Sequence, residues 1–183
     1  MNIKSCTKCD LCISNNFVPV SGRGSHNADI FIIGEAPGYY EMKKREPFVG
    51  KSGTLLQTFI NRYNFKDKVY ITNIVKCRPP GNRNPTNIEI ETCIKYLILE
   101  LYIIKPKIII LLGNIAIQGY LGKTIPISKV SGKVLKLKPI VAFLYHPAYV
   151  LRNNESIKDY IKVFDEILEY YVMNINASHK VMM

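Results

Sequence analysis

Short, almost wholly apolar runs alternate along this chain with longer segments whose apolar residues recur every three or four positions. An apolar run bounded by polar, Gly or Pro residues is typical of a buried strand, whereas the longer spacing is typical of a helix with one buried face. We therefore expect strands at 28–34, 68–73 and 107–112, with the last strands inside 134–144. We expect helices at 53–63, 86–103, 116–121 and 156–173.

The alternation of these elements predicts the fold class. Apolar strands separated by helices indicate an α/β protein with a mainly parallel sheet that is covered on both faces. Thr86 and Glu89 have the spacing of a capping box, which supports a helix start at that point. No internal repeat or linker-like stretch divides the chain, so we expect one domain over 1–183 with a flexible tail over 174–183.

Polar and Gly/Pro-rich segments follow the predicted strands in three places. In an open parallel sheet the ligand crevice lies beyond the carboxyl ends of the strands. The three segments are therefore expected to converge on one site. They are Gly34–Gly38, Asn73–Arg78 and His146–Arg152.

Composition and charge narrow the class of partner. The chain has 183 residues, of which 48% are apolar, and its 25 Lys and Arg against 14 Asp and Glu give a formal net charge of +11. This excess favours a polyanionic partner, most simply nucleic acid, although surface lysines also serve solubility alone. No apolar run approaches the roughly 20 residues that span a bilayer, and the first residues lack the apolar stretch of a signal peptide. We expect an intracellular protein of the cytoplasm or nucleoid with no membrane partner.

Five cysteines point to a reducing compartment and to a metal site. An odd number fits poorly with a fully paired disulfide scaffold. Two-residue spacings bring thiolates close enough to share a metal ion or cluster, and two distant cysteines can complete a set of four ligands. Spacing alone does not choose between zinc, an iron–sulfur cluster and buried thiols, and the fourth Cys and following Pro of a ferredoxin run are missing. The five are Cys6, Cys9, Cys12, Cys77 and Cys93.

Several specific motifs stand in order along the chain. They are Cys6-x-x-Cys9, Gly34-Glu-Ala-Pro-Gly38, Glu41, Pro47-Phe-Val-Gly50, Tyr70-Ile-Thr-Asn73, Lys76-Cys-Arg-Pro-Pro80, Cys93 and His146-Pro-Ala-Tyr-Val-Leu-Arg152. Together they closely resemble the family 4 uracil-DNA glycosylases, the thermostable iron–sulfur type within the uracil-DNA glycosylase superfamily. The resemblance implies a three-layer α/β/α sandwich with a central, mainly parallel sheet. It also implies hydrolysis of the bond between uracil and deoxyribose, which leaves an abasic site in base excision repair.

The resemblance further implies a [4Fe–4S] cluster as cofactor, with Cys6, Cys9, Cys77 and Cys93 as its ligands. Cys12 lies outside the family pattern and is expected to be a spare buried thiol, because four ligands complete the site. The cluster is regarded as structural in this family. It would tie the N-terminal segment to the loop and helix that contain the two distant ligands.

The uracil pocket is also assigned by the resemblance. A glycosylase must extrude the base and recognise its hydrogen-bonding edge. Asn73 matches the family's uracil-reading asparagine, because one amide offers an acceptor for N3–H and a donor for O4, whereas cytosine reverses both groups. Phe48 is expected to stack on the flipped ring. Substrate contacts are also expected around Glu35, Ala36 and Gly38, where little side-chain bulk lets backbone N–H groups approach uracil O2 and the sugar.

The departure of uracil as an anion requires a donor near O2 and a carboxylate or positioned water near the sugar. His146 resembles the family's motif histidine, which is the proposed O2 donor. Ala36 stands where the best-known members of the superfamily carry an Asp. Glu41 is therefore expected to assist formation of the sugar cation or attack by water, with Glu35 as the alternative.

DNA must also be gripped and bent. Val150 and Leu151 fall where the superfamily inserts an apolar wedge into the space left by the flipped base, and the sequence does not choose between them. The basic run 43–45 is expected to add nonspecific attraction. Further candidates for phosphate contacts are Lys51, Ser52, Arg78 and Arg152.

We expect the protein to act as a monomer on uracil in single- or double-stranded DNA, without strand cleavage, since the resembling motifs carry no lysine nucleophile. The alternative is a uracil-DNA binding protein that traps its product covalently or has lost turnover. Related cross-linking proteins insert a histidine near the segment 41–48, where this chain carries only Lys, Arg and Glu as charged residues. A redox or sensor protein is disfavoured by the incomplete ferredoxin spacing. The sequence identifies no downstream repair protein or sliding clamp.

Overall fold

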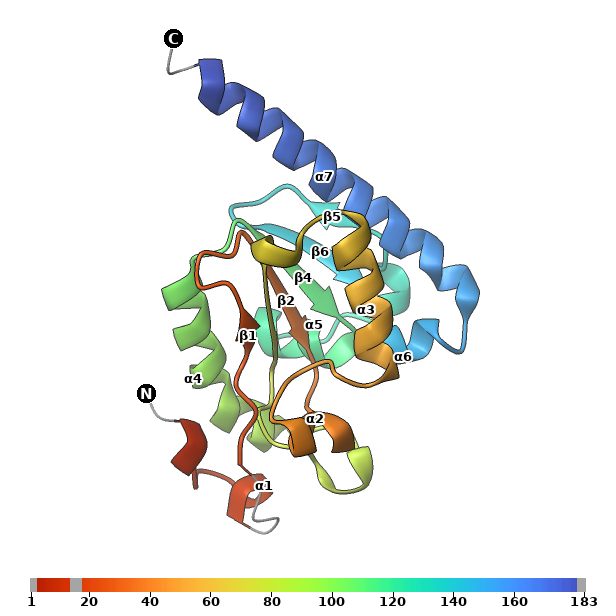
Figure 1. Cartoon of the computed structure of the whole chain (residues 1–183). Coiled ribbons are helices and arrows are strands. Elements are labelled where there is room, and N and C mark those ends of the chain that lie inside the picture. Colours follow the sequence, from red (N-terminus) through yellow and green to blue (C-terminus); the bar gives the residue numbers. More distant parts are fainter. Residues whose placement is uncertain (1–2, 14–17, 181–183) are drawn as a thin grey trace.

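A six-stranded sheet forms the centre of the protein, whose computed structural model describes residues 3–13 and 18–180 (Figure 1). The strand order is β1-β3-β2-β4-β6-β5. The four inner strands are parallel, and the short strands β1 and β5 pair antiparallel at the two edges. The strands are β1 (Arg23–Gly24), β2 (Ile30–Gly34), β3 (Val69–Asn73), β4 (Ile108–Leu112), β5 (Val134–Leu135) and β6 (Ile140–Leu144).

Helices cover both faces of the sheet, which gives the predicted three-layer α/β/α sandwich (Figure 1). Helices α4 and α5 contribute to the core on one face, and α3 and α7 to the core on the other. The helices are α1 (Asp10–Ile13), α2 (Tyr39–Lys44), α3 (Lys51–Arg62), α4 (Asn87–Ile104), α5 (Asn114–Leu121), α6 (Pro147–Val150) and α7 (Ile157–Lys180).

The inner strands are largely apolar because each of them contributes to two cores, and β3 ends in the buried polar residues Thr72 and Asn73. Successive strand residues point to opposite faces of a sheet. Phe31 and Ile33 of β2 accordingly belong to the core with α4 and α5, whereas Ile30 and Ile32 belong to the core with α3 and α7. Every residue of β2, β3, β4 and β6 is buried, which explains why these strands appear in the sequence as continuous apolar runs.

Helix α4 begins with the predicted capping box. The Glu89 N–H donates to Thr86 Oγ1 at 3.3 Å, and the Thr86 N–H donates to Glu89 Oε2 at 2.7 Å. Arg83 donates from both guanidinium nitrogens to the same carboxylate, and these bonds hold the pKa of Glu89 below its usual range. These bonds fix the start of α4 to the loop that follows β3. Cys93 lies further along the same helix.

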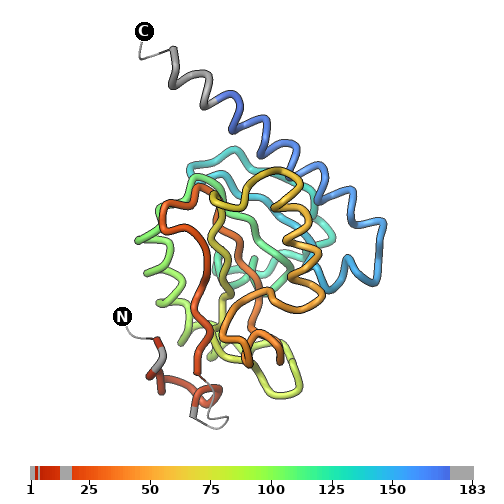
Figure 2. The backbone as a smooth tube through the Cα atoms, viewed as in Figure 1, coloured from red at the N-terminus to blue at the C-terminus, as the bar shows by residue number. Residues whose placement is uncertain are grey.

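Two features of the elements differ from the sequence prediction. Helices α2 and α6 lie in segments that we expected to be loops, because six and four residues are too few to show a helical period. Helix α7 continues to Lys180, beyond the end at residue 173 that we predicted for it. The flexibility expected for 174–183 stays a prediction, and residues 181–183 lie outside the described chain. Figure 2 shows the backbone of this helix projecting away from the sheet toward the C-terminus. Across residues 3–13 and 18–180, no helix is both long and apolar enough to cross a membrane.

Candidate active site

The carboxyl ends of the parallel strands bring the first group of predicted site residues together. Gly34, the last residue of β2, is paired in register with Asn73, the last residue of β3. His146 follows β6 and forms the N-cap of α6. Pro147 occupies the first position of that helix, where its missing N–H and fixed φ are tolerated.

Gly34, Asn73 and Phe48 lie in close contact, and we call the region that Asn73 and Phe48 border together with His146 the slot. A Cβ atom on Gly34 would overlap Asn73 Oδ1 and would lie 2.6 Å from Phe48 Cζ, so only glycine fits between the amide and the ring. Asn73 and Phe48 are both buried, at 3% and 6% exposure. The Phe48 ring lies 5.7 Å from the His146 ring between centroids. An amide, an aromatic face and an imidazole therefore border the same small region.

The backbone of Phe48 is held in an unusual conformation. Its φ is +56°, in the left-handed region that bulky residues rarely adopt. Its carbonyl carbon and oxygen also lie where a Cβ of Gly53 would be, so helix α3 can approach this residue only through a glycine. Such strain persists where the surrounding packing enforces it, and it occurs often at binding sites.

His146 is poised as a neutral donor. Its Nδ1 accepts the Ala148 N–H at 3.2 Å, so the proton of the neutral ring resides on Nε2. Burial, assisted by the charge of Arg152, lowers the pKa of His146 to about 4. The segment itself is anchored by Tyr160, whose hydroxyl donates to the Tyr145 carbonyl at 2.6 Å.

Glu41 bridges the N-termini of two helices. Its Oε2 accepts the N–H of Gly38, the N-cap of α2, at 3.1 Å, and its Oε1 accepts the N–H of Gly50, the N-cap of α3, at 3.3 Å. A carboxylate is favoured at helix N-termini, where backbone N–H groups lack partners. The Gly38 N–H, which we expected to face the substrate, is thus used by Glu41. Each carboxylate oxygen keeps a further lone pair for a water molecule or a developing cation.

Glu35 and Ala36, in the loop after β2, are only partly buried. Glu35 is partly buried, and this burial raises the pKa of its carboxyl group. Its backbone carbonyl accepts the Val75 N–H at 3.0 Å, which ties the loop after β2 to the loop after β3. Ala36 packs against the core beside α4 and α5.

The structure separates the two candidates for the DNA wedge. Val150 is completely buried in the core formed with α3 and α7, whereas Leu151 is 47% exposed just beyond the end of α6. The assignment of Val150 to DNA contact is therefore corrected, because its side chain already fills the core. Arg152 beside it is exposed, as is Lys51 at the start of α3.

Ser52 and Arg78 are less exposed than Arg152 and Lys51. Ser52 is partly buried in the first turn of α3. Arg78 Nε donates to Asn82 Oδ1 at 2.7 Å, and its guanidinium carbon lies 5.4 Å from the centre of the Tyr39 ring. Arg78 is therefore oriented by an amide and an aromatic ring.

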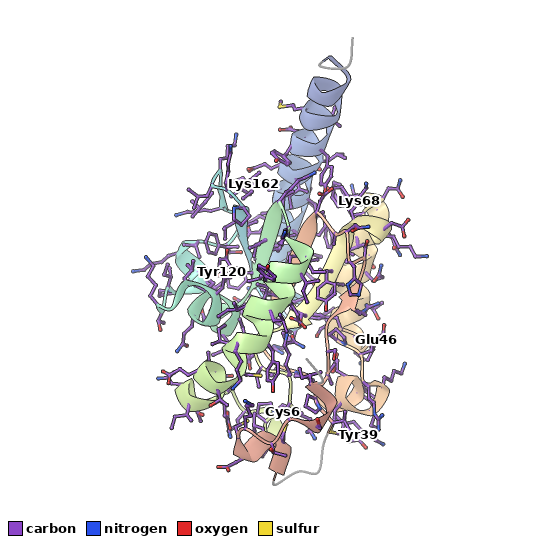
Figure 3. All side chains as sticks on the ribbon, turned by 90° about the vertical axis from the view of Figure 1, so that its left-hand side faces the viewer. Cys6, Tyr39, Glu46, Lys68, Tyr120 and Lys162 are labelled. Atoms are coloured by element: carbon purple, nitrogen blue, oxygen red, sulfur yellow. The ribbon has the colours of Figure 1, made fainter. Side chains whose placement is uncertain are left out.

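All five cysteines line one small cavity at this end of the molecule, and all five are free thiols. Cys12 Sγ lies 2.8 Å from Cys77 Sγ, the Tyr96 hydroxyl donates to Cys6 Sγ at 3.0 Å, and the Lys76 N–H donates to Cys93 Sγ at 3.3 Å. Figure 3 shows Cys6 and Tyr39 toward the same end, opposite Lys68 and Lys162.

The side chains that could hold a metal group in this cavity are thiols, the donors that iron–sulfur clusters take. Within the described ranges, no three His, Cys, Asp or Glu side chains are placed to hold one metal ion. A cluster takes thiolates at its separate corners, and hydrogen bonds to sulfur, such as those from Tyr96 and Lys76, are typical of its surroundings. Residues 14–17 of the cysteine-rich segment lie outside the described chain.

A buried ionic network beneath Asn73 was missed by the sequence analysis. Lys76, only 1% exposed, donates from Nζ to the Asn73 carbonyl at 2.8 Å, to Thr72 Oγ1 at 2.6 Å and to Glu100 Oε2 at 2.6 Å. Thr72 in turn donates to Glu100 at 2.9 Å. The signals in the sequence were a lysine three residues after a buried strand and a glutamate within an apolar helix.

The largest cleft lies beside this site. It has a volume of about 780 Å³ and runs between the β1–β3 edge and α3. Phe48 lines it, but Asn73, Glu41 and His146 do not. The arrangement of reactive groups, and not the size of a cavity, therefore locates the candidate active site.

Comparison with known proteins identifies the family of this chain. The family model of the uracil DNA glycosylase superfamily matches residues 21–170. The type-4 uracil-DNA glycosylase of Archaeoglobus fulgidus is 42% identical over 178 aligned residues, covering 91% of this chain and 88% of that protein. The type-4 enzyme of Sulfurisphaera tokodaii is 42% identical over 177 residues, with coverage of 90% and 80%. That of Thermotoga maritima is 38% identical over 159 residues, with coverage of 84% and 82%.

Proposed function

This chain belongs to the uracil DNA glycosylase superfamily, and from that premise we propose that it hydrolyses the bond between uracil and deoxyribose in DNA, leaving an abasic site for repair. The observation that carries the proposal is the gathering of the Asn73 amide, the Phe48 ring and the His146 imidazole beside Gly34. An amide can pair with one edge of a flat ring that presents a donor and an acceptor, and an aromatic side chain can cover the face of that ring. Uracil has this shape and this edge.

Asn73 selects the base in this proposal. Its Oδ1 accepts uracil N3–H, and its Nδ2–H donates to uracil O4. Cytosine would set an acceptor against Oδ1 and a donor against the amide N–H, and a buried mismatch of this kind costs about 1–3 kcal/mol for each unpaired group. Phe48 covers one face of the ring and excludes water from it.

His146 assists the departure of uracil. As the C1′–N1 bond breaks, its electron pair leaves with uracil, and negative charge grows on O2. The His146 Nε2–H donates to O2 and stabilises this charge without giving up its proton. The reverse orientation of the ring is opposed by the bond from the Ala148 N–H to Nδ1.

Glu41 acts on the sugar side of the bond. The water oxygen forms the new bond to C1′, and the water proton passes to a Glu41 oxygen and then to solvent. The two backbone bonds from Gly38 and Gly50 hold this carboxylate in place before substrate arrives. Glu35, whose pKa is raised by burial, is less suited to act as the base.

We assign Cys6, Cys9, Cys77 and Cys93 as the residues that would hold a [4Fe–4S] cluster, with Cys12 as a thiol packed beside them. When bound, the cluster supplies a covalent cross-link between the N-terminal segment, the loop after β3 and helix α4. The residues of that loop, Arg78 among them, are then held at a fixed distance from the uracil slot.

The substrate in this proposal is uracil in single- or double-stranded DNA, and the protein acts as a monomer inside the cell, at the nucleoid. Lys51, Ser52, Arg78 and Arg152 contact phosphates, and Leu151 enters the space left by the base. The trapping alternative gains no support from the segment that follows Glu41. Its residues Lys43, Lys44 and Arg45 are exposed, and none of them is a histidine.

The test uses cluster-loaded protein and a labelled oligonucleotide with one uracil, followed by alkali, with thymine and cytosine substrates beside it. We expect alkali-dependent cleavage at uracil only. Asn73→Ala should reduce kcat/KM about 10- to 100-fold through loss of base recognition. Glu41→Gln should reduce kcat more than KM. Asn61→Ala and Glu91→Gln, at exposed positions on α3 and α4, are the matched controls.

Two outcomes would contradict the proposal. Absence of cleavage by the cluster-loaded wild type would refute the glycosylase activity. A denaturation-resistant complex with uracil DNA, formed without release of uracil, would support the trapping alternative instead.

A further inference from the structure

Helix α2 carries two exposed aromatic rings, flanked by cations, that the proposed chemistry does not use. Tyr39 and Tyr40 are 42% and 63% exposed, and their rings meet edge to face at 5.4 Å. The Lys43 ammonium lies 4.6 Å from the centre of the Tyr39 ring, and the Arg78 guanidinium carbon lies 5.4 Å from the same centre. We call these four residues the tyrosine surface.

The tyrosine surface stands directly beside the candidate active site. Glu41, on the same short helix, faces inward and bonds the backbone N–H groups of Gly38 and Gly50. Tyr39 and Tyr40 keep much of their area exposed, and neither belongs to one of the two hydrophobic cores. Figure 3 shows Tyr39 toward the same end of the molecule as Cys6.

Arg78 and the α2 residues of the tyrosine surface are each held in place. Arg78 is fixed by its bond to Asn82 Oδ1 at 2.7 Å, and it directly follows the buried Cys77. Tyr39 and Lys43 are one helical turn apart and pack on each other. The guanidinium and the ammonium therefore flank a ring whose neighbour Tyr40 is free to receive another flat group.

We propose that the tyrosine surface binds the unpaired nucleotides next to the extruded uracil, with bases stacked on Tyr40 and Tyr39 and phosphates paired with Lys43 and Arg78. Stacking platforms beside cations are the general solution for binding single-stranded nucleic acid, because every base has an aromatic face. In a duplex those faces are covered by neighbouring bases, so the surface favours single-stranded substrate. The position next to uracil rests on the proposed function, whereas the binding itself does not.

The charges around the surface suit this partner. Lys44 and Arg45 are exposed directly after Lys43, and the whole chain carries a net charge of +11. An anionic strand is therefore drawn to the end of the molecule where the rings lie. A peptide or a second copy of this basic chain would have to overcome the same positive charge.

The experiment measures binding of cluster-loaded full-length protein to a fluorescent oligo-dT strand without uracil, and to its duplex with oligo-dA, by anisotropy. Tyr39→Ala/Tyr40→Ala is compared with Tyr39→Phe/Tyr40→Phe. Tyr102→Ala is the matched control, because Tyr102 is 72% exposed with Lys105 Nζ at 5.7 Å from its ring. It lies near the end of α4, at the amino edge of β4 and away from the site.

We expect the alanine pair to weaken single-strand binding at least about fivefold, the phenylalanine pair to stay near wild type, and the duplex to change less than about twofold. Tyr102→Ala should bind like wild type. The proposal is overturned if the alanine pair binds the single strand normally, if the phenylalanine pair loses as much, or if Tyr102→Ala loses as much. Uracil release is followed separately, so failure of the glycosylase assay leaves this result interpretable.

Discussion

At the residue scale, His146 and Glu41 are both oriented by backbone N–H groups. His146 accepts one such bond from Ala148, and Glu41 accepts two, from Gly38 and Gly50. Backbone donors at element ends cannot swing away as side chains do, so both catalytic candidates are preorganised. These bonds orient the remaining Nε2–H donor of His146 and the remaining lone pairs of Glu41.

The pKa of His146 gives a prediction for pH dependence. Because burial lowers this pKa to about 4, the ring is neutral across the range in which a free histidine titrates, near pH 6.5. We expect kcat/KM of the wild type to show no inflection due to His146 between about pH 5 and 8. The measurement is a pH profile for wild type and His146→Gln on the same uracil substrate.

The same shift affects stability. Between about pH 6.5 and 4, His146 binds a proton in the unfolded chain but not in the folded chain. The free energy of unfolding is therefore highest above pH 6.5 with respect to His146, and it falls as the pH decreases. Urea unfolding at several pH values should show a smaller loss on acidification for His146→Gln. An inflection near pH 6.5 in the kcat/KM profile of the wild type that His146→Gln abolishes would contradict the buried neutral ring.

At the element scale, two adjacent apolar residues at the end of the short helix α6 have different surroundings. Val150 faces the core, and Leu151 faces solvent. Val150→Ala should lower the free energy of unfolding by about 1–3 kcal/mol through the cavity it leaves, with activity retained at low temperature. Leu151→Ala should leave stability within about 0.5 kcal/mol and slow uracil release from duplex more than from single strands.

The two substitutions serve as controls for each other. Both variants are measured by thermal unfolding and by uracil excision from duplex and from single-stranded DNA. Equal effects of the two substitutions on duplex excision at matched stability would contradict the assignment. Loss of activity by Val150→Ala alone would reverse it.

The ionic network between β3 and α4 gives a second prediction at this scale. Lys76→Met should destabilise the protein by about 3–5 kcal/mol, because Glu100 would remain largely buried without its cation. The double variant Lys76→Met/Glu100→Gln should recover part of that loss, since a neutral amide can still accept from Thr72. Denaturant unfolding of both singles and the double measures the coupling. Iron content is compared in every variant because Lys76 neighbours Cys77.

A double variant as unstable as the sum of the two singles would contradict the pairing. Because Lys76 also donates to the Asn73 carbonyl, the test has a functional readout besides stability. Discrimination between uracil and cytosine should weaken in Lys76→Met at temperatures where it is fully folded.

At the scale of the whole molecule, the cysteine cavity joins three segments that are distant in sequence. The thiols come from the segment before β1, the loop after β3 and helix α4. Figure 2 shows the N-terminal segment lying at the end of the protein from which α2 also projects. A link at this point stabilises the same end that carries the uracil slot and the tyrosine surface.

We therefore expect Cys93→Ala to lose most of its iron and the visible absorption of the cluster, and to melt at lower temperature. Cys12→Ala should retain both signals, because its thiol only packs against Cys77. Iron analysis, absorption spectra and thermal unfolding measure these effects. Loss of iron in Cys12→Ala with retention in Cys6→Ala would make Cys12 a ligand in place of Cys6.

The sequence by itself determined the sheet, its covering helices and the family. Each inner strand is buried on both faces, so its composition reports its place whatever its neighbours are. The capping box at Thr86 and Glu89 is equally local, because all its bonds lie within one turn. The family motifs gave the uracil slot in outline, since they follow strands whose carboxyl ends must meet.

Only the tertiary structure decided how individual side chains in the connecting segments are used. Val150 and Leu151 are equally apolar, and their fates differ because α6 packs one of its sides against the core. The left-handed backbone of Phe48, the burial of Lys76 and the approach of Cys12 to Cys77 depend on partners elsewhere in the chain. Short loops and helices have no period from which burial can be inferred, so long-range packing alone fixes their contacts.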